Sequence, residues 1–285
     1  MKLVAKTLCV AGLAVQPVTQ ASAIIMRHDV DRSRYLALGE QHRQTLVMLG
    51  LRSKDDGASL LYNGMGTLIA PRWVLTAAHA AEAMKVPAEG QPDPYFVFVK
   101  GRGYRVEKIY THPGWNESGE GAANDIALIK LATPVREAQP ACLYEGTTEL
   151  DQTVTVVGAG YPGDGVQGPT VPDGALLGGT VRVDTVNALD IRWKFRPPDD
   201  PRTTPLEGIS GPGDSGGPGF LVVKGRTCVA GVSSSQAYEI DPTKPDPGAM
   251  KQGRYGAIEI YTRVSAFADW IRTTVGARTN SETSP

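Results

Sequence analysis

The sequence predicts an all-β fold made of many short strands joined by turns. Its 33 glycines and 21 prolines are spread along the chain, and short apolar runs recur between them. Such runs, bounded by turn residues, are typical of β-strands. With 285 residues, 41% of them hydrophobic, the chain is long enough to bury a full core in one or two domains.

Apolar runs in the N-terminal half are the first expected strands. They cover residues 46–49, 66–69, 96–99 and 104–110, and the polar stretch 53–57 is expected to form a hairpin loop between the first two. Residues 24–40, which precede them, are rich in charge. We expect an extended arm there.

The C-terminal half contains further expected strands and three long loops. Strands are expected at residues 153–160, 181–186, 190–195, 220–223 and 228–233, and residues 133–152 are expected to cross between the two halves. Residues 161–174, 196–208 and 236–253 are rich in glycine, proline or polar side chains, which favours loops. Ser265 is expected to cap a short closing helix with Phe267, Trp270, Ile271 and Val275 on one face.

The first 23 residues have the pattern of a secretory signal peptide. Lys2 and Lys6 give a positive start, and residues 8–15 form an apolar core too short to span a bilayer. Ala21-Ser22-Ala23 is a small-residue cleavage site. A buried N-terminal helix is the alternative. We therefore expect a secreted or periplasmic protein without a membrane anchor.

Charge and ligand spacing limit the partners that the chain is expected to bind. A formal net charge of −1 gives no reason to expect a nucleic-acid partner. No spacing typical of metal ligands is found in the sequence, and we expect no metal and no cofactor, with a weak calcium site on a loop as the alternative. Cys9 falls within the expected signal peptide, so Cys142 and Cys228 remain as an even pair in an oxidising compartment.

The most informative stretch is residues 211–218, GPGDSGGP. Four glycines and two prolines in eight residues exclude a regular helix or strand, and glycine permits positive φ and close backbone approach. Ser215 stands at the centre of this loop with glycine amides beside it. A nucleophile and its oxyanion donors are presented together in this way. For this motif taken alone, a glycine-rich turn between strands is the alternative.

A serine nucleophile needs a base, and the sequence has four histidines, at positions 28, 42, 79 and 112. None follows Ser215, which excludes the Ser–acid–His order of α/β-hydrolases, although residues 213–217 fit their G-x-S-x-G motif. His79 is the best candidate because an apolar run delivers it and small residues surround it. His112 is the rival, but it precedes a proline in an expected turn.

Asp125 is the candidate acid. It precedes the apolar run 126–131, and a carboxylate that opens a buried strand needs a partner such as an imidazole N–H. Taken singly, His79 could be a core histidine and Asp125 a strand cap. In the order His79, Asp125, Ser215, however, the three residues follow the chymotrypsin-type triad.

Four blocks of sequence resemble the trypsin/chymotrypsin-like serine proteases. They are LTAAH at 75–79, NDIAL at 124–128, GDSGGP at 213–218 and IYTRV at 260–264, and the resemblance runs from about residue 45 to about residue 275. It implies two six-stranded antiparallel β-barrels with the site between them, and it implies a secreted, monomeric endopeptidase of the bacterial type that cleaves polypeptides. The expected division is a signal peptide at 1–23, the arm and first barrel at 24–140, and the second barrel with a short C-terminal helix at 141–285.

The resemblance also implies roles for individual residues. Ser215 attacks the scissile carbonyl, His79 is the base and Asp125 orients it, while the amides of Gly213 and Ser215 form the oxyanion hole. Ser233 matches a serine that hydrogen-bonds the triad aspartate.

The substrate pocket departs from the trypsin pattern. Ile209 stands six residues before the serine, where trypsin-like enzymes carry an acid that attracts Lys or Arg, so an apolar pocket is expected. Ser235 and Glu259 are the other expected pocket residues, and Glu259 stands where glycine is usual in the family. If Glu259 points inward, cleavage after basic residues is expected; if it points outward, it is a solvated strand residue.

Asp214 matches the aspartate that receives a freed apolar N-terminus in relatives. Cleavage after Ala23 would expose Ile24-Ile25, so export is expected to yield the active chain without a further step. The departure is that Met26-Arg27 replaces the usual glycines. Cys142 and Cys228 both fall in the second half, where we expect one disulfide, with two buried free cysteines as the alternative.

Two other functions remain open. A protease fold without activity would be a binding module, but its mark would be a missing triad member, and none is missing here. The same triad also hydrolyses esters, so an esterase on this fold is the second alternative.

Overall fold

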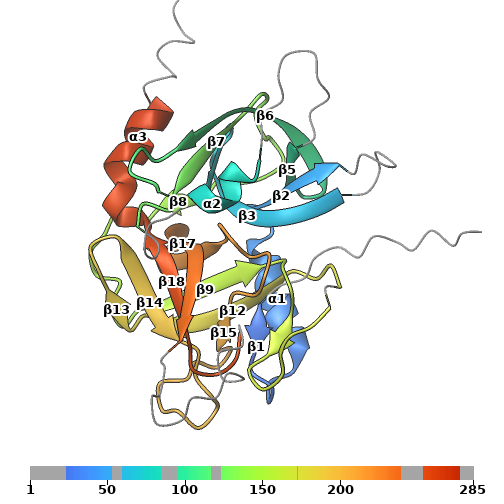
Figure 1. The fold of residues 1–285 in the computed structure, drawn as a ribbon, viewed down its shortest axis with the longest axis vertical. Coiled ribbons are helices and arrows are strands. Elements are labelled where there is room, and N and C mark those ends of the chain that lie inside the picture. The colour runs from blue at the N-terminus through green and yellow to red at the C-terminus, as the bar shows by residue number, and fades with distance from the viewer. Residues whose placement is uncertain are drawn as a thin grey trace, which may run out of the picture.

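The computed structural model describes residues 24–52, 60–84, 95–116, 123–171, 173–238 and 253–276. The expected signal peptide, the expected hairpin loop at 53–57 and most of the expected loop at 236–253 lie outside these residues. Two β units lie one above the other, and the C-terminal helix lies beside the upper, N-terminal unit (Figure 1).

The N-terminal unit is a closed antiparallel barrel with the strand order β2-β3-β4-β7-β6-β5. Each strand contains one of the apolar runs that the sequence predicts. Their bounds are β2 (Leu46–Arg52), β3 (Leu60–Ala70), β4 (Trp73–Thr76), β5 (Tyr95–Val99), β6 (Arg102–Thr111) and β7 (Ala127–Leu131). The short helix α2 (Ala78–Glu82) follows β4 directly.

The C-terminal unit is built on a sheet with the order β12-β9-β16-β17-β18-β14-β13, in which β8 also pairs with β17. Within the part of the chain that the structure describes, β12 and β13 do not pair with each other, so this sheet is open where a second closed barrel was expected. The expected all-β fold class is confirmed, with a closed barrel, a second, open sheet and a short C-terminal helix. The strands are β8 (Cys142–Leu143), β9 (Thr153–Gly158), β12 (Leu177–Arg182), β13 (Thr185–Val186), β14 (Asp190–Lys194), β16 (Pro218–Val223), β17 (Arg226–Tyr238) and β18 (Ala257–Arg263).

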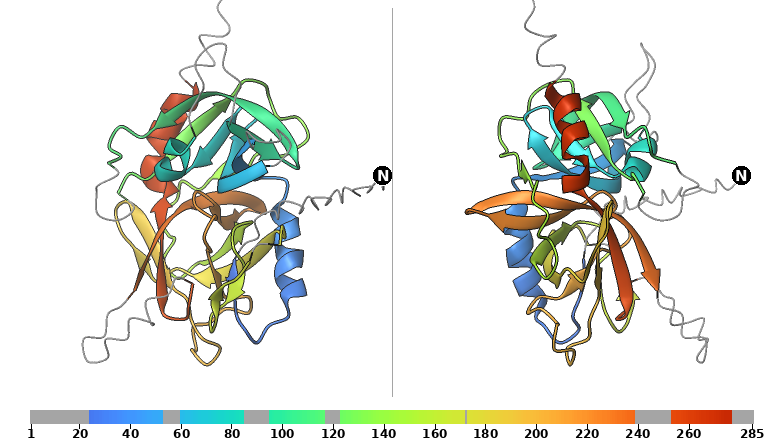
Figure 2. Two further views of the ribbon diagram at one scale, coloured as in Figure 1. Left: turned by 45° about the vertical axis from the view of Figure 1, so that its right-hand side comes forward. Right: turned by 90° about the vertical axis from the view of Figure 1, so that its left-hand side faces the viewer.

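The N-terminal segment corrects the expectation of an extended arm. A short strand, β1 (Ile25–Met26), is followed by the helix α1 (Arg32–His42), which begins where the Asp31 side chain accepts a hydrogen bond from the Ser33 amide at 2.8 Å. The helix packs on β12, and Figure 2 shows it against the C-terminal unit. Gly39 permits this close approach, since a Cβ there would lie 2.5 Å from the Leu176 carbonyl oxygen. Charged residues lie on the exposed side of this helix, and they are the reason why the sequence did not predict it.

Strand β1 joins a small sheet with the order β11-β10-β1-β15. Its other members are β10 (Gly163–Asp164), β11 (Gly168–Pro169) and β15 (Gly208–Ile209), which fall in or at the end of stretches expected to be loops. The segment expected to accompany the first barrel thus lies in the C-terminal unit.

Cys142 and Cys228 form the predicted disulfide, which joins β8 to β17. The predicted closing helix is present as α3 (Ala268–Gly276), preceded by a 3-10 turn over Val264–Phe267. Its expected cap is wrong. The Ser265 hydroxyl donates to Oε1 of the buried Glu149 at 2.8 Å, and Arg263 pairs with the same carboxylate.

Candidate active site

His79 lies in α2, three residues beyond the end of the strand β4, which delivers it to the edge of the barrel. Its Nδ1 lies 2.7 Å from Oδ2 of Asp125, and its backbone amide donates to Oδ1 of the same carboxylate at 2.9 Å. Asp125 precedes β7, which pairs with β4, so adjacent strands bring the two residues together. Because Nδ1–H faces a carboxylate, Nε2 is left as the proton acceptor.

Asp125 is 1% exposed, and its carboxylate is held by hydrogen bonds. Burial acts to raise its pKa, but the His79 imidazole and the Ser234 hydroxyl outweigh burial, and the pKa of Asp125 is lowered below its usual range. The Ser234 hydroxyl donates to Oδ2 at 2.6 Å. A carboxylate that stays ionised can orient the imidazole and stabilise its protonated form.

The serine that contacts Asp125 is thus Ser234, and the expectation for Ser233 is corrected. The pairing of β17 with β18 shifts register between Ser233 and Ser235. Ser234 lies at that irregularity, and its hydroxyl reaches Asp125. The Ser233 hydroxyl instead contacts the Ser210 hydroxyl at 3.3 Å. Simple strand alternation could not have indicated this irregularity.

Ser215 lies in the predicted irregular loop, which both units hold in place. The Met65 amide of the first barrel donates to the Ser215 carbonyl at 2.8 Å, and the Gly216 amide donates to the Ser233 carbonyl at 2.9 Å. Gly216 has a φ of +80°, and a Cβ there would lie 2.1 Å from Oγ1 of Thr76, at the end of β4. Only glycine fits this position. The loop is therefore fixed beside the strand end that leads to His79.

Three polar groups of this loop, one hydroxyl and two amides, have no hydrogen-bond partner among the described residues. Among the described residues, the Ser215 hydroxyl makes no hydrogen bond, with His79 or with any other group. Contacts between nucleophile and base are often long in unliganded enzymes. In the same part of the chain, the amides of Gly213 and Ser215 have no acceptor, as expected of oxyanion donors.

Asp214 is buried behind this loop. It accepts hydrogen bonds from the amides of Gly160 at 2.7 Å, Gly211 at 2.8 Å and Ile24 at 3.2 Å. Burial raises the pKa of Asp214 to about 6, against these three amides, which lower it. The backbone at position 158 lies so close to the Asp214 carboxylate that glycine is required there, since a Cβ would lie 2.3 Å from Oδ1.

A small pocket of about 60 Å³ opens beside Ser215. Both Glu259 and Ser235 line it, and the Glu259 side chain is directed inward, with 1% of the residue exposed. The other lining residues are mostly small or polar. They are Ser210, Gly211, Pro212, Ser233, Ser234 and Gln236.

Ile209 does not line this pocket, and the apolar floor expected from it is corrected. Ile209 pairs with Ile25 across β15 and β1, and it packs in a separate buried cluster with Phe195 and Ala257. The next residue, Ser210, turns toward the pocket instead. Neither Ser210 nor Gln236 was expected at the site, and no motif marks them in the sequence.

His112, the other candidate for the base, packs against aromatic residues near the C-terminal helix. His112 is edge-on to the rings of Phe267 and Trp270, with centroids 5.0 Å and 5.1 Å away, and its Nδ1 accepts from the Gly114 amide at 3.1 Å. It joins a loop of the first barrel to the C-terminal helix. Among the described residues, no group of three or more His, Cys, Asp or Glu is placed to hold a metal ion.

Comparison with known proteins finds one matching family model and several similar proteins. Residues 41–271 match the family model for Trypsin. The chain is 27% identical over 242 residues to the complement C1s subcomponent of Sus scrofa, covering 74% of this chain and 32% of the relative. It is 28% identical over 267 residues to phenoloxidase-activating factor 3 of Holotrichia diomphalia, covering 84% of this chain and 70% of that protein.

The chain spans about a third of the length of the complement relatives that it matches. These relatives are animal proteins, and the bacterial type expected from the sequence stays a prediction. No helix in the described ranges is long and apolar enough to cross a membrane. Because the family match covers most of its length, the chain belongs to the trypsin-like serine protease family.

Proposed function

We propose that this chain is a secreted serine endopeptidase that hydrolyses peptide bonds through an acyl-enzyme on Ser215. The observation that carries the proposal is the double hydrogen bond between His79 and Asp125, at 2.7 Å and 2.9 Å, beside a serine loop with two unused amides. No triad member is missing, which argues against an inactive binding module.

The reaction follows from the groups present. Ser215 Oγ attacks the scissile carbonyl carbon while Nε2 of His79 takes the hydroxyl proton. The carbonyl oxygen becomes an oxyanion, which the amides of Gly213 and Ser215 stabilise; each such donor typically contributes about 10²–10³ in rate. His79 then gives the proton to the amine nitrogen as the scissile C–N bond breaks, which leaves the acyl group on Ser215 Oγ. A water molecule next attacks the acyl carbonyl carbon while His79 takes one of its protons. The bond to Oγ breaks, His79 returns the proton to the serine oxygen, and the carboxylic acid product leaves.

We further propose that Glu259 directs cleavage to the carboxyl side of Lys or Arg. Among the described residues, its Oε2 accepts hydrogen bonds from the Ser210 amide at 3.1 Å and from Gln236 Nε2 at 3.2 Å. Burial raises the pKa of Glu259 well above its usual range, because it removes the carboxylate from water, and no ion pair of Glu259 with a cation is found among the described residues. A substrate Lys or Arg entering the pocket would supply that cation.

Export of the chain with removal of residues 1–23 is part of the proposal. Ile24 has a φ of +55°, a conformation that is costly for a β-branched residue. Such strain is typically worth about 1–3 kcal/mol. Cutting the bond before Ile24 abolishes this torsion and converts the Ile24 amide at Asp214 into an ammonium. The new terminus would then be formed already in contact with its carboxylate.

A fluorophosphonate probe tests the proposed nucleophile. The chain beginning at Ile24 should be labelled covalently on Ser215, and Ser215→Ala should abolish labelling with little change in thermal stability. Ser33→Ala, which alters an exposed serine on α1, is the matched control and should label like the wild type. Labelling that persists in Ser215→Ala would overturn the assignment. Hydrolysis of ester substrates without any peptide cleavage would favour the esterase alternative.

A further inference from the structure

Helix α1 directs one fully buried polar side chain, that of Tyr35, toward the N-terminal strand. Its ring is 0% exposed, whereas most of the helix surface faces outward. The Tyr35 hydroxyl accepts a hydrogen bond from the Arg27 amide at 3.2 Å and donates one to the Glu207 carbonyl at 2.9 Å. One hydroxyl thus joins two segments of chain that are 180 residues apart in sequence.

The two segments joined by Tyr35 are the continuations of a strand pair. Arg27 directly follows β1 and Glu207 directly precedes β15, and these strands are antiparallel, with Met26 opposite Gly208. Arg27 adds a second link at the same end, because its Nη1 donates to the Thr204 carbonyl at 3.1 Å. The Tyr35 hydroxyl therefore closes one end of the β1–β15 pair.

The other end of this pair leads to Asp214. Ile24, which precedes β1, donates its amide to Oδ2 of Asp214, and Gly211, two residues beyond β15, donates its amide to the same oxygen. Both strands thus run from the Tyr35 contact to the carboxylate that lies between Gly213 and Ser215. A shift of β1 relative to β15 would move these two amides apart at Asp214.

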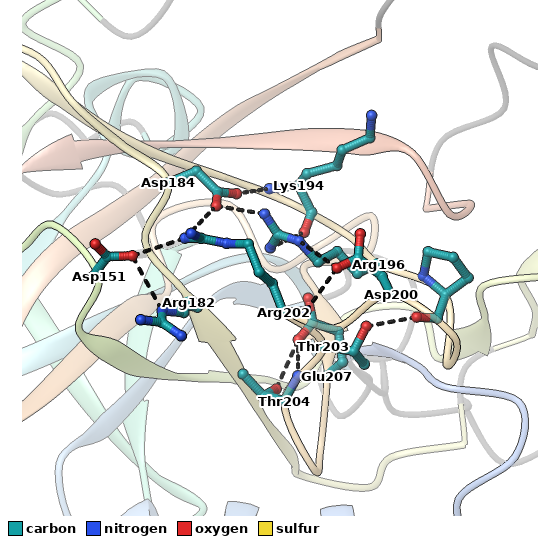
Figure 3. Close-up of polar contacts among 11 residues, drawn as sticks. Asp151, Arg182, Asp184, Lys194, Arg196, Asp200, Arg202, Thr203, Thr204 and Glu207 are labelled. Atoms are coloured by element: carbon teal, nitrogen blue, oxygen red, sulfur yellow. Dashed lines mark hydrogen bonds and ion pairs between the residues drawn. The ribbon is translucent and has the colours of Figure 1, made fainter.

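Both sides of the Tyr35 contact are held by further interactions. On one side, the Glu207 carboxylate accepts from the amide and hydroxyl of Thr204, at 2.7 Å and 2.8 Å. Figure 3 shows this pair beside the ion pairs that hold the same loop, in which Arg202 reaches Asp184 and Asp151. On the other side, α1 is fixed to β12 through the close approach of Gly39.

We infer that Tyr35 is a positioning residue for the oxyanion site. Through β1 it keeps the Ile24 nitrogen at Asp214, and so keeps the amides of Gly213 and Ser215 where they stabilise the oxyanion. This inference rests on the proposed function. It assigns helix α1 a role in catalysis although no residue of the helix lines the substrate pocket or belongs to the triad.

Tyr35→Phe tests this role, because it removes the one oxygen atom and keeps the ring. Tyr144→Phe is the matched control: the Tyr144 hydroxyl also accepts a backbone amide, from Thr148 at 3.3 Å, and Tyr144 is also buried in the C-terminal unit. Each variant is made as the chain beginning at Ile24. The rate at which cyanate carbamylates the Ile24 amine is followed by mass spectrometry of the N-terminal peptide, and kcat and KM are measured on an ester substrate.

Tyr35→Phe should raise the rate of Ile24 carbamylation at least fivefold and lower kcat about tenfold, with KM within twofold of the wild type. Tyr144→Phe should leave both nearly unchanged even where it lowers the melting temperature equally. Equal behaviour of the two variants in both measurements would overturn the inference. The carbamylation rate needs no activity, so it tests Tyr35 even if fluorophosphonate labelling refutes the proposed nucleophile.

A second measurement uses the wild type alone and covers the case in which Tyr35→Phe does not fold. Amide hydrogen exchange at Arg27 is compared before and after covalent labelling of Ser215. Occupation of the oxyanion site should slow exchange at Arg27, because the coupling between two sites is reciprocal. An exchange rate that labelling does not change would overturn the inference.

Discussion

The amide nitrogen of Ile24 lies 3.2 Å from Oδ2 of Asp214, a residue 190 positions further along the chain. This contact connects the start of the described chain with the residue that precedes the proposed nucleophile. Asp214 is fully buried, and among the described residues it is backbone amides that offset the cost of burying its charge. The charge on the Ile24 nitrogen should therefore decide how stability depends on pH.

The first prediction compares the chain that begins at Ile24 with one that keeps residues before it. In the longer form the pKa of Asp214 is about 6 when folded and near 3.8 when unfolded. The folded state then keeps a proton that the unfolded state releases, so stability falls as pH rises from about 4 to 6. The loss amounts to about 3 kcal/mol. In the chain that begins at Ile24, the ammonium favours ionised Asp214 and should remove this loss.

Urea unfolding of both forms at pH 4, 5, 6 and 7 measures the difference. The advantage of the chain that begins at Ile24 should grow across this range. Other buried carboxyls that do not interact with Asp214, such as Glu149, are common to both forms and cancel. Asp214→Asn is the control, in which the difference between the forms should no longer depend on pH. Parallel curves for the two wild-type forms would contradict the prediction.

The second prediction concerns Glu259. Glu259→Gln should reduce kcat/KM on Arg substrates at least tenfold, about 1.4 kcal/mol of transition-state binding, and spare apolar substrates. Since burial raises the pKa of Glu259, the preference of the wild type for Arg over Leu should increase with pH as the carboxyl ionises. The variant should show no such increase. Glu40→Gln, on the exposed side of α1, is the matched control.

A library of peptide substrates provides the measurement. A wild-type profile dominated by Phe or Leu at the cleaved position would show that the Glu259 carboxyl stays protonated in the complex. In that case the small pocket selects by size and not by charge.

The third prediction separates two neighbouring serines. Ser234→Ala removes a hydrogen bond to the ionised Asp125, a contact of a kind typically worth about 1.5–3 kcal/mol. We expect kcat to fall about tenfold or more. Ser233→Ala removes only a 3.3 Å contact to Ser210 and should have a smaller effect. A larger loss of kcat in Ser233→Ala would mean that the register irregularity in β17 is misplaced.

The fourth prediction concerns the disulfide. Replacing both Cys142 and Cys228 by Ala removes a cross-link over 86 residues. The free energy of unfolding should fall by roughly 2–4 kcal/mol. Urea titration of the double variant and of reduced wild type should give similar midpoints. A midpoint equal to that of the oxidised protein would contradict the prediction.

Sequence patterns predicted most strands because each strand contains a short apolar run, and turn residues separate one run from the next. Helix α1 was missed because it buries little beyond Tyr35 and Gly39, so its charged sequence has no apolar stripe. The close contact of Gly39 with Leu176 is a property of packing and leaves no local signal.

At the candidate site, sequence motifs indicated His79, Asp125 and Ser215 because each stands in a distinctive block. The family resemblance placed the partner of Asp125 one residue too early, at Ser233, because the register shift between β17 and β18 leaves no signal in the sequence. Ile209 was expected in the pocket because of its distance from Ser215 in sequence. The pairing of β15 with β1 instead commits its side chain to another cluster.

The Ser234 hydroxyl, on the C-terminal sheet, reaches Asp125, on the N-terminal barrel, while Met65 of the barrel binds the Ser215 carbonyl. The residues of the proposed reaction are thus divided between the N-terminal and the C-terminal unit, which must keep a fixed position relative to each other. The rate of turnover should respond to a change in that position more strongly than the spectroscopic signals of either unit. Under mild denaturant or pressure, turnover should fade before the circular dichroism of the strands changes. A covalent inhibitor on Ser215 that contacts both units should then make the two units unfold in a single transition.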